Sequence, residues 1–413
     1  MDMVEAPGSE VTAEELSRLE AMVREAEPAF LAGLERLVNT DCGSYTPEGV
    51  DEVGRFVAGF LSNLGADVEA RPDPDRKFGS TIVGRFDGEP GGRRVVMVGH
   101  MDTVFDPGTA AERPFRVEDG RGLGPGVSDM KGGLLAGLYA IRALRDLNGG
   151  TLPFERLTFI ANPDEEVGSP TSTPHIREAA ADADLALMME CARANGNIVS
   201  SRKGIVDARI AITGRSAHAG VEPEKGRSAI LAAADVVQRL HLLNGRWEGV
   251  TVNVGVISGG TRPNVVAEHC ELQVDLRAVG RDEVDEVENE IRAMIRSLSV
   301  EETSAEMTEM ARWWPMEKLA RSGRLASTAI ALGDRLGMTF EDQATGGAGD
   351  ANTTAGMGVP SLDGLGPIGG LDHSPGEYLE LDSIVPRTAL LAALLLAVSR
   401  DPVVRAWRDE PSA

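Results

Sequence analysis

One candidate metal ligand stands at the end of a predicted strand. His100 and Asp102 follow the apolar segment RVVMV within the motif GHMD. Residues i and i+2 of a strand face the same way. His100 could therefore bind a metal ion while Asp102 holds its other ring nitrogen and fixes the tautomer. The motif alone is weak evidence, because an ordinary polar pair at a strand end is the commoner explanation.

A carboxylate lies in a glycine-rich segment that precedes a predicted helix. Asp129 belongs to GLGPGVSDMKGG, whose glycines allow a close approach of the backbone to a ligand. A phosphate-binding loop is the main alternative. The chain lacks the lysine motif of a P-loop, and GxGxxG without its following acidic residue is weak evidence. The segment fits a metal-binding carboxylate at least as well.

Three consecutive acids follow the apolar segment LTFIAN. They are Asp164, Glu165 and Glu166. Adjacent side chains diverge, so one carboxylate could bind a metal ion while its neighbour faces an attacking water molecule, as metal-assisted hydrolysis requires. A solvated acidic turn is the alternative that the segment leaves open.

Two further residues complete a possible ligand set. Glu190 ends the apolar run LALMM, and His373 lies in GGLDHSPGEY. Zinc binds histidine nitrogen and carboxylate oxygen, and two metal ions bridged by one carboxylate form a known hydrolase site. Because ligand sites in open α/β sheets lie at the carboxyl ends of strands, these residues predict a hydrolytic metal site there.

The six histidines divide by context. His100, His218 and His373 lie in turns rich in Gly and Ser. The remaining three lie in helix or strand patterns, and we expect them to be structural: His175, His241 and His269.

Strands and helices alternate on both sides of a central segment. Helices are predicted at 11–38, 50–64 and 130–147, and strands at 94–98, 157–161 and 185–189. Beyond the central segment, helices are predicted over about 320–336 and 383–399, on either side of a Gly-rich loop at 345–350. Strands that alternate with helices predict an α/β sheet covered on both faces.

The order of elements changes in the central segment. It predicts a strand at 205–213, a helix at 227–243, strands at 250–257 and 268–274, a helix at 281–298 and a strand at 304–310. In the first of these helices, Ile230, Ala234, Val237 and His241 are predicted to share the buried face. We therefore expect an α+β domain at 203–312, inserted into a catalytic domain whose two segments are 1–202 and 313–413.

Composition excludes several classes of protein. The 413 residues carry a formal net charge of −24, which argues against binding to nucleic acid or to an anionic membrane surface. Three distant cysteines form no CxxC pair, and the N-terminus lacks the pattern of a signal peptide, so we expect a cytoplasmic protein. The apolar run 389–398 is too short to span a bilayer and predicts a buried helix.

Taken together, these segments resemble the M20 zinc exopeptidases, and within them the glutamate carboxypeptidases of the carboxypeptidase G type. The resemblance extends from about residue 30 to residue 400. It rests on the order and spacing of these motifs: GHMDTV, GPGVSDMKGG, PDEEVGS, ITGRSAHAGVEPEKGRSAI, GGTRPNVV, VDLR, TGGAGDA and LDHSPGEYLELDSI.

The resemblance implies a mixed-sheet catalytic domain that holds two zinc ions, with Co²⁺ or Mn²⁺ as other possible metals. One zinc would take His100 and Glu190, the other Glu166 and His373, and Asp129 would bridge both. Glu165 would be the general base that activates the attacking water, and Asp102 would orient the first histidine. The resemblance also implies a cis peptide bond between Asp129 and Met130.

The same resemblance implies roles for the inserted domain. It implies a ferredoxin-like lid that also forms a homodimer. His218 would stabilise the oxyanion, in many relatives from the partner subunit. Asn264 and Arg277 would contact the carboxylate of the substrate, and Gly347 would lie near its terminus. A planar guanidinium suits such a carboxylate well.

The function that follows is hydrolysis of an amide bond next to a free carboxylate. The substrate would be a small peptide or an N-acyl amino acid, and the product a C-terminal amino acid such as glutamate. The segment SRKGI at 201–205 departs from the carboxypeptidase G pattern and resembles other amidohydrolases of the family. Deacylation of N-acetyl or N-succinyl amino acids, as in acetylornithine deacetylase or succinyl-diaminopimelate desuccinylase, is therefore the alternative. Cys191-Ala192 after Glu190 is a second departure.

Two alternatives come from other classes of protein. A non-catalytic binding protein of the same fold would be expected to lack a ligand or the base, whereas every expected residue is present. A nucleotide-binding oxidoreductase would rest on GLGPG alone.

Overall fold

The computed structural model describes Gly8 and residues 10–407, which divide into two compact units. Among these residues, the first unit comprises those up to Ser200, Lys318–Ala344 and those from Gly349 onward, and the second comprises Ser201–Glu317 and Thr345–Ala348. Most of the N-terminal segment that argued against a signal peptide lies outside the described residues.

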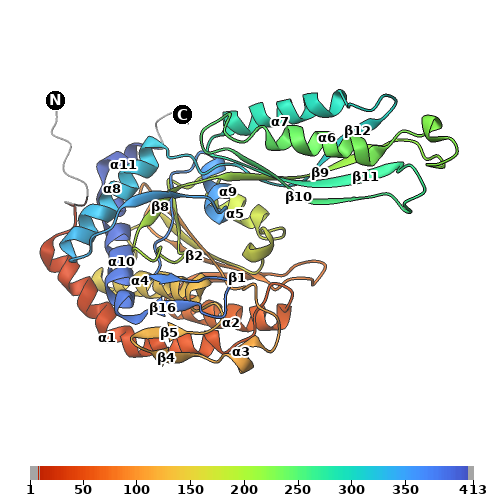
Figure 1. Ribbon diagram of the computed structural model, residues 1–413. Helices are drawn as coiled ribbons and strands as arrows, with labels where there is room; N and C mark the ends of the chain where they lie inside the picture. Colours follow the sequence, from red (N-terminus) through yellow and green to blue (C-terminus); the bar gives the residue numbers. More distant parts are fainter. Residues whose placement is uncertain (1–7, 9, 408–413) are drawn as a thin grey trace. The chain divides into compact units, whose positions relative to one another are not determined.

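The first unit is built around a six-stranded mixed sheet of order β1-β2-β6-β3-β7-β14 (Figure 1). The neighbours of β3 and β7 run parallel, whereas β2 runs antiparallel to both β1 and β6. The strands are β1 (Asp67–Arg71), β2 (Thr81–Asp87), β3 (Arg94–His100), β6 (Arg156–Asn162), β7 (Leu185–Met188) and β14 (Ser361–Leu362). The α/β prediction with a mixed sheet is confirmed.

Helices cover this sheet because its strands are apolar on both faces. Val95 and Met97 of β3 belong to the main core, and their neighbours Val96 and Val98 are buried on the opposite face. The main core packs against α1 (Ala13–Val38), α2 (Pro47–Asn63), α4 (Gly133–Leu147), α8 (Ala320–Arg335) and α10 (Ile384–Arg400). In Figure 1, α5 (Thr173–Ala180) and α9 (Asp350–Gly356) lie on the other side of the sheet from α4 and α10.

The last long helix is apolar around its whole circumference. A stretch at Leu381–Arg400 is long and apolar enough to cross a membrane by length and composition, but 83% of its window is buried inside the structure. It contacts α1, α4 and α8. The predicted buried helix is confirmed, and its hydropathy reflects a position in the core.

Smaller elements complete the first unit. A four-stranded sheet has the order β15-β16-β5-β4, and β8 pairs with β13. The bounds of these elements are β4 (Arg116–Glu118), β5 (Arg121–Leu123), β8 (Ile198–Arg202), β13 (Asp342–Thr345), β15 (Gly369–Gly370), β16 (Tyr378–Glu380), α3 (Thr109–Glu112), α11 (Pro402–Ala406), η1 (Val127–Gly132), η2 (Glu165–Val167) and η4 (Leu381–Ser383).

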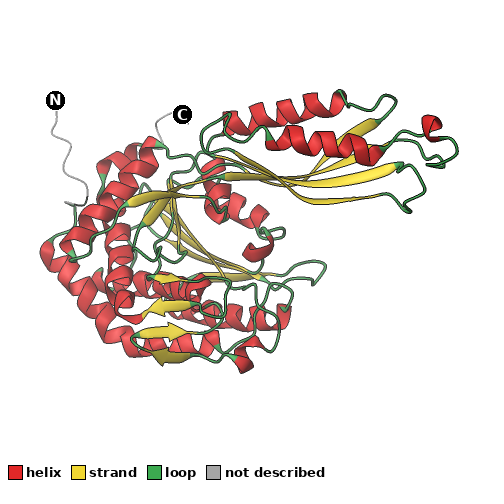
Figure 2. Ribbon diagram, in the orientation of Figure 1, coloured by secondary structure: helices red, strands yellow, loops and turns green. Residues whose placement is uncertain are grey.

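The second unit is an antiparallel sheet with helices on one face. Its strands are β9 (Gly204–Thr213), β10 (Thr251–Gly259), β11 (His269–Ala278) and β12 (Ser304–Trp313), in the order β10-β11-β9-β12. Its helices are α6 (Ala229–His241) and α7 (Arg281–Arg296), with the short turn η3 (Pro223–Lys225) before them. Both helices lie on one face of the sheet (Figure 2). The connectivity βαββαβ and this strand order are those of a ferredoxin-like fold.

Two local predictions are wrong. In α6 the buried residues are Ala229, Ala232, Ala233, Val236 and Leu240, so the face with Ile230 and Ala234 points outward. The helix predicted from residue 130 begins at 133, because η1 precedes it and contains non-helical Asp129 and Met130.

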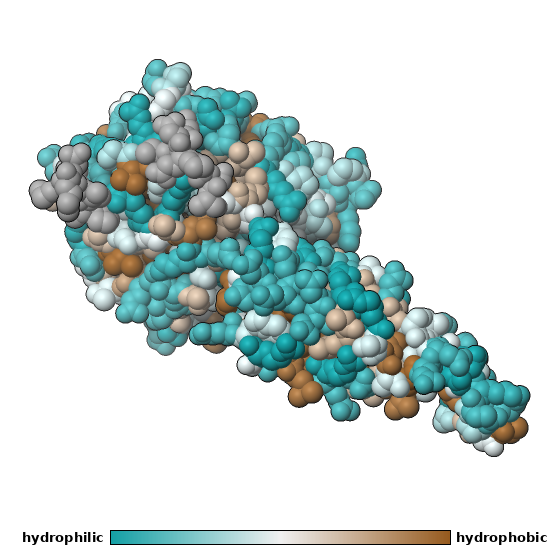
Figure 3. Space-filling model, turned by 90° about the horizontal axis from the view of Figure 1, so that it is seen from above, coloured by the Kyte–Doolittle hydropathy of each residue, from teal (hydrophilic) through white to brown (hydrophobic). Residues whose placement is uncertain are grey.

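Polar side chains dominate the face of the molecule that Figure 3 shows. Figure 3 shows a face that is mostly hydrophilic, with apolar side chains scattered over it. Only a few of the 65 acids are buried, and several of these gather at one edge of the first unit's sheet.

Candidate metal centre

Several predicted site residues of the first unit follow strands that run in parallel. His100 is the last residue of β3, Glu165 and Glu166 open η2 just after β6, and Glu190 follows β7 by two residues. Since β6, β3 and β7 are parallel neighbours, their carboxyl ends meet at the same edge of the sheet. Gly133 lets α4 approach this edge closely, because a Cβ atom there would collide with the carbonyl oxygen of Met189.

Asp129 lies between two histidines. Its Oδ1 is 3.0 Å from Nε2 of His100, and its Oδ2 is 3.2 Å from Nε2 of His373. Each histidine also faces a glutamate. Nε2 of His100 is 3.7 Å from Oε1 of Glu190, and Nε2 of His373 is 3.1 Å from Oε2 of Glu166. One carboxylate thus joins two half-sites, each completed by one imidazole and one carboxylate.

The distances and donor types fit metal ions. The possible ligand atoms of His100, Asp129 and Glu166 all lie within 4.8 Å of one another. Two ligands that each lie about 2.0–2.2 Å from one tetrahedral zinc ion are about 3.4 Å apart. In addition, Oε1 of Glu166 is buried and has no hydrogen-bond partner among the described residues. A buried carboxylate oxygen without a donor is costly unless a cation binds it.

Burial and charge shift the pKa values of the two histidines and of Asp129. Burial opposes a charged imidazole at His100, but hydrogen bonds with Asp102 and Asp129 outweigh it and hold the pKa well above the usual range. Hydrogen bonds with Asp129 and Glu166 raise the pKa of His373 to about 11. Burial opposes the charge of Asp129, yet the two histidines hold its pKa well below the ordinary value. The carboxylates attract positive charge strongly, as expected of a cation site.

Asp102 ties two strand ends together. Its carboxylate accepts hydrogen bonds from the backbone N–H groups of Glu165 (3.1 Å) and Glu166 (3.2 Å) and from Oγ of Ser44 (2.6 Å). Its Oδ1 also lies 3.3 Å from Nδ1 of His100. The side chain therefore fixes the turn that carries both glutamates as well as the imidazole.

Glu165 is buried beside this cluster. Burial first, and then Glu190, Asp350 and Glu166, raise the pKa of its carboxyl well above the ordinary value, against the opposing effect of His100. Asp350, which opens α9, accepts hydrogen bonds from Oγ of Ser169 (2.6 Å) and from the Asn162 amide. Burial raises the pKa of Asp350 to about 6. A buried carboxyl with a raised pKa suits proton transfer.

The neighbouring Asp164 has a structural role. Its carboxylate accepts hydrogen bonds from the backbone N–H (2.6 Å) and hydroxyl (2.7 Å) of Thr171 and from Oγ of Ser172 (2.5 Å).

Cys191 is buried, and its Sγ lies 3.7 Å from Oδ2 of Asp372. Burial raises the pKa of this thiol well above the ordinary value, so it is protonated and poorly suited to bind metal.

Two residues that position the site were not identified from sequence. Glu377 accepts hydrogen bonds from the backbone N–H groups of Gly126 (2.9 Å), Ser128 (2.9 Å) and Asp129 (3.0 Å). Its position in the motif LDHSPGEY was the one feature of the sequence that could have indicated this role.

The peptide bond between Asp129 and Met130 is cis, as the resemblance implied.

The buried Arg387 of α10 is the second such residue. It donates to the carbonyl oxygens of Gly366 (3.0 Å), Gly196 (3.1 Å) and Gly364. The backbone N–H of Gly366 in turn donates to the carbonyl oxygen of Glu190 (2.8 Å). A basic residue in an apolar helix pattern gave no indication of this role.

Two predicted site residues of the second unit, His218 and Asn264, lie on neighbouring exposed segments. His218 is exposed, and its Nδ1 accepts a hydrogen bond from the backbone N–H of Gly220 (3.2 Å). Asn264 is exposed, and its carbonyl oxygen accepts from the backbone N–H of Ala219 (3.0 Å). The second unit therefore brings His218 and Asn264 close through the backbone.

Arg277 already has partners within its unit. It donates from Nε (3.0 Å) and Nη2 (3.0 Å) to Asp275, and from Nη1 to the carbonyl oxygen of Gly346 (3.0 Å). Gly347 is exposed, and its carbonyl oxygen accepts from Nη1 of Arg202 (3.0 Å). These arginines hold the segment at 345–348 against the strands of the second unit.

The three remaining histidines lie outside the cluster. Nδ1 of His175 is 3.2 Å from Nη1 of Arg71, and His241 and His269 are exposed on the second unit. None of them faces the acids described above.

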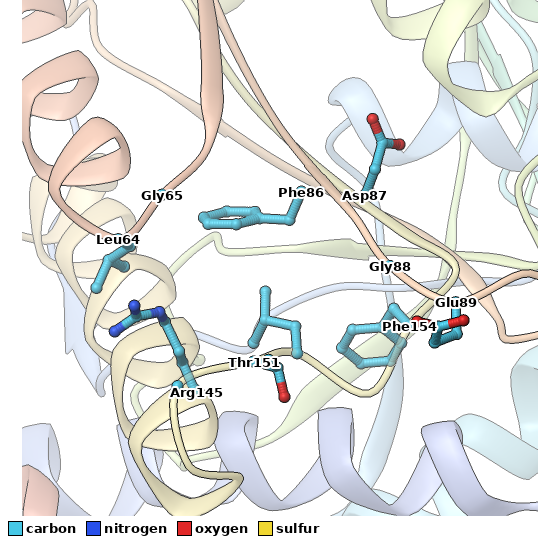
Figure 4. Close-up of a pocket in the computed structure, with 11 residues that line it drawn as sticks. Leu64, Gly65, Phe86, Asp87, Gly88, Glu89, Arg145, Thr151 and Phe154 are labelled. Atoms are coloured by element: carbon cyan, nitrogen blue, oxygen red, sulfur yellow. The ribbon is translucent and has the colours of Figure 1, made fainter.

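A cavity of about 530 Å³ lies elsewhere in the first unit (Figure 4). Phe86 and Phe154 line it, and Asp87, Glu89 and Arg145 lie at its edge. Asp87 ends β2, which runs antiparallel to β6, and Phe154 precedes the start of β6. The cavity therefore lies at the opposite end of the strands from the metal-ligand cluster, and none of the predicted site residues lines it.

The fold and the donor cluster define a metal-dependent hydrolase of the α/β class. Comparison with known proteins identifies the family: the model of peptidase family M20/M25/M40 matches residues 96–397. The chain belongs to this family, and the predicted resemblance is confirmed.

Individual relatives include both peptidases and deacetylases. Carboxypeptidase G2 of Pseudomonas sp. (strain RS-16) is 31% identical over 374 residues, which cover 90% of this chain and 89% of the relative. An acetylornithine deacetylase of Proteus mirabilis is 29% identical over 268 residues, covering 60% of this chain and 67% of the relative. Among solved structures, aminopeptidase PepT of Bacillus cereus has a TM-score of 0.75 at 23% identity, covering 91% of this chain and 99% of that chain, which supports the fold.

Proposed function

We propose that this enzyme is a two-metal hydrolase that cleaves an amide bond next to a free carboxylate and releases a C-terminal amino acid. The observation that carries the proposal is the position of Asp129, whose two carboxylate oxygens face two different histidines. The three acids that face only two imidazoles leave an excess of negative charge, which two divalent cations would neutralise. The likeness to carboxypeptidase G2 supports this substrate class.

The residues divide into two ligand sets. His100 and Glu190 would hold one zinc ion, Glu166 and His373 the other, and Asp129 would bridge them. When bound, such ions polarise a substrate carbonyl and make water more acidic. Co²⁺ or Mn²⁺ could take the same nitrogen and oxygen donors.

Glu165 would move the proton. Its buried carboxylate would take a proton from the attacking water and deliver it to the nitrogen of the leaving amine. Asp102 would hold His100 and the turn with both glutamates in place through the hydrogen bonds described above.

The second unit would contribute to binding and to stabilisation of the oxyanion. His218 would donate a hydrogen bond to the developing oxyanion. Asn264, Arg277 and Gly347 would contact the carboxylate end of the substrate, where the guanidinium still has N–H groups beyond those bonded to Asp275 and Gly346. In this proposal the unit also acts as a lid, as domain 203–312 was expected to do.

We further propose a homodimer formed through the second unit in the cytoplasm. The exposed side chains of Ile230, Leu231 and Leu242 on and after α6, and of Val256 and Ile257 on β10, support an interface. β10 ends the described sheet, and an unpaired strand edge favours association.

The test replaces Glu165 by Gln. Loss of the proton acceptor should lower kcat by about 10²- to 10⁴-fold, while the bound metal, measured by mass spectrometry after dialysis against zinc, stays at two per chain. Glu118→Gln, an exposed acid on β4, is the matched control and should keep its activity. Full turnover of Glu165→Gln would contradict the assignment.

A second candidate is deacylation of N-acetyl or N-succinyl amino acids, which the acetylornithine deacetylase relatives favour. Both reactions break an amide bond with the same groups. A panel of N-acyl-glutamates, N-acetylornithine and N-succinyl-diaminopimelate separates them, since the better substrate has the higher kcat/KM.

A further inference from the structure

A small pocket lies against one half-site of the metal-ligand cluster. It has a volume of about 260 Å³ and includes Glu166 and Val167 in its wall. Pockets for drug-sized ligands span about 300–1,000 Å³, so this one has room for a single side chain or acyl group. The rest of its wall comes from the segments 43–46 and 103–107.

Several of the side chains that line this pocket are apolar or aromatic. Tyr45, Val104 and Phe105 line it together with Val167. Tyr45 is 63% exposed and Val104 42% exposed, which is unusual for large apolar side chains of the first unit. Exposed apolar side chains that gather at a cavity mark a binding surface rather than incomplete packing.

Contacts from outside the pocket hold its two aromatic walls. The Nζ atom of Lys77 lies 5.2 Å from the ring centre of Tyr45, and the guanidinium carbon of Arg113 lies 4.7 Å from that of Phe105. Such cation–π contacts restrict the rings. The walls are therefore formed before a ligand arrives, which limits the entropic cost of binding.

Hydrogen bonds of Ser44 connect the pocket to the metal-ligand cluster. The backbone N–H of Ser44 donates to the carbonyl oxygen of Thr103 (3.1 Å), which joins the two wall segments. The hydroxyl of the same Ser44 donates to Asp102 (2.6 Å), the residue that holds His100 and the turn with Glu166. A group in the pocket would thus lie at a fixed place relative to the ligands.

Charge indicates which half of the substrate fits. No lysine or arginine is among the described residues that line the pocket, and its two charged members, Asp106 and Glu166, are acids. A carboxylate in the pocket would therefore lose water without gaining a cationic partner from the lining. The free carboxylate of the substrate belongs elsewhere, and the pocket suits the opposite, acyl half.

We infer that the pocket at Tyr45, Val104 and Phe105 binds the acyl group of the substrate and selects an uncharged apolar or aromatic group over a small or anionic one. This rests on the proposed amide hydrolysis. It predicts that N-benzoyl amino acids are better substrates than N-acetyl ones, and that N-succinyl ones are the poorest of the three.

The test fills the pocket. Val104→Trp should lower kcat/KM for N-benzoyl-glutamate by about 10- to 200-fold, the range for a disrupted apolar pocket, while N-acetyl-glutamate changes by less than about threefold. Val117→Trp places the same side chain at an apolar position that is 57% exposed on β4, and it should change neither value. Tyr45→Ala removes one wall and should reduce the preference for benzoyl without the bulk of tryptophan.

A binding measurement separates this inference from the proposed function. In the Glu165→Gln background, calorimetry should show tighter binding of N-benzoyl- than of N-acetyl-glutamate, and Val104→Trp should remove the difference. If the wild type cleaves neither compound but binding still discriminates, the reaction is wrong and the pocket stands. Turnover with equal effects of Val104→Trp on all acyl groups, or with no effect, would overturn the pocket.

Discussion

His100 of the first unit and His218 of the second are both candidate catalytic histidines, but their surroundings differ. His100 is buried and lies within 3.7 Å of three acids, Asp102, Asp129 and Glu190. His218 is exposed and bonds through its ring only to the backbone N–H of Gly220 among the described contacts. The first unit therefore surrounds its histidine with acids of its own fold, whereas the second presents His218 on an exposed turn.

This difference predicts how substitutions at each histidine affect metal binding, stability and turnover. In the first unit the candidate ligands His100, Asp129 and His373 contact other side chains of the same fold, so we expect a substitution there to affect metal binding and stability together. An exposed histidine can act only on a group brought from outside its own fold. Its removal should therefore change turnover and leave metal content and stability unaltered.

The largest effect should come from the residue that joins the two half-sites. Asp129→Ala removes one donor from each metal position and leaves His100 and His373 facing a void. The metal supplies several kcal/mol of transition-state stabilisation, so activity should fall by about 10³-fold or more. Metal analysis after dialysis against zinc should show fewer than two ions per chain.

Asp164→Asn is a useful comparison for this variant, because Asp164 is a buried acid next to Glu165 whose carboxylate accepts hydrogen bonds from Thr171 and Ser172. It should lower thermal stability and keep both metal ions in the folded protein. If Asp129→Ala retained two ions and ordinary turnover, the two half-sites would not share this carboxylate.

An intermediate effect is expected from the second unit. His218→Ala should lower kcat by about 10²- to 10³-fold, the usual result of removing one oxyanion donor, with unchanged metal content and unfolding temperature. His241→Ala is the matched control, because it removes another exposed histidine from the same unit. Equal activity of the two variants would show that the second unit does not take part in the chemistry.

The elements that carry the site could be predicted because parallel strands share an edge. His100, Glu166 and Glu190 each follow an apolar run, and that rule alone brings them together. Glu377 escaped prediction because its partners are backbone N–H groups about 250 residues away in sequence. A side chain that recognises the backbone leaves no pattern of residue types.

The wrong face of α6 has a different cause. The helix is rich in alanine, so apolar residues occur on several faces and periodicity does not select one. The structure places the small side chains Ala229, Ala232 and Ala233 against the sheet and leaves Ile230 and Leu231 exposed. Small side chains allow the helix to pack closely on the sheet, and this packing outweighs the burial of the larger apolar side chains. Those larger side chains are therefore exposed, where the proposed dimer could use them.

The smallest effect should come from an ion pair at the periphery of the first unit. The carboxylate of Glu15 on α1 accepts hydrogen bonds from Nη1 (3.0 Å) and Nη2 (2.7 Å) of Arg400, the last residue of α10. The hydrogen bond with Arg400 lowers the pKa of Glu15 to about 2, although burial opposes it. Because the folded pKa is depressed, the pair stabilises the fold above the ordinary pKa of about 4.3, and this contribution disappears as the pH falls toward 2.

Glu15→Gln should therefore lower the free energy of unfolding by about 1 kcal/mol at pH 7, the upper range for a partly exposed pair. The difference from the wild type should shrink between about pH 4 and pH 2. Urea unfolding of metal-free protein at several pH values measures it. Glu302→Gln in the second unit is the control, since Arg227 lowers the pKa of Glu302 at a fully exposed position where solvent screens the pair. A pH-independent difference for Glu15→Gln would mean that the capping contact with Thr12, rather than Arg400, carries the effect.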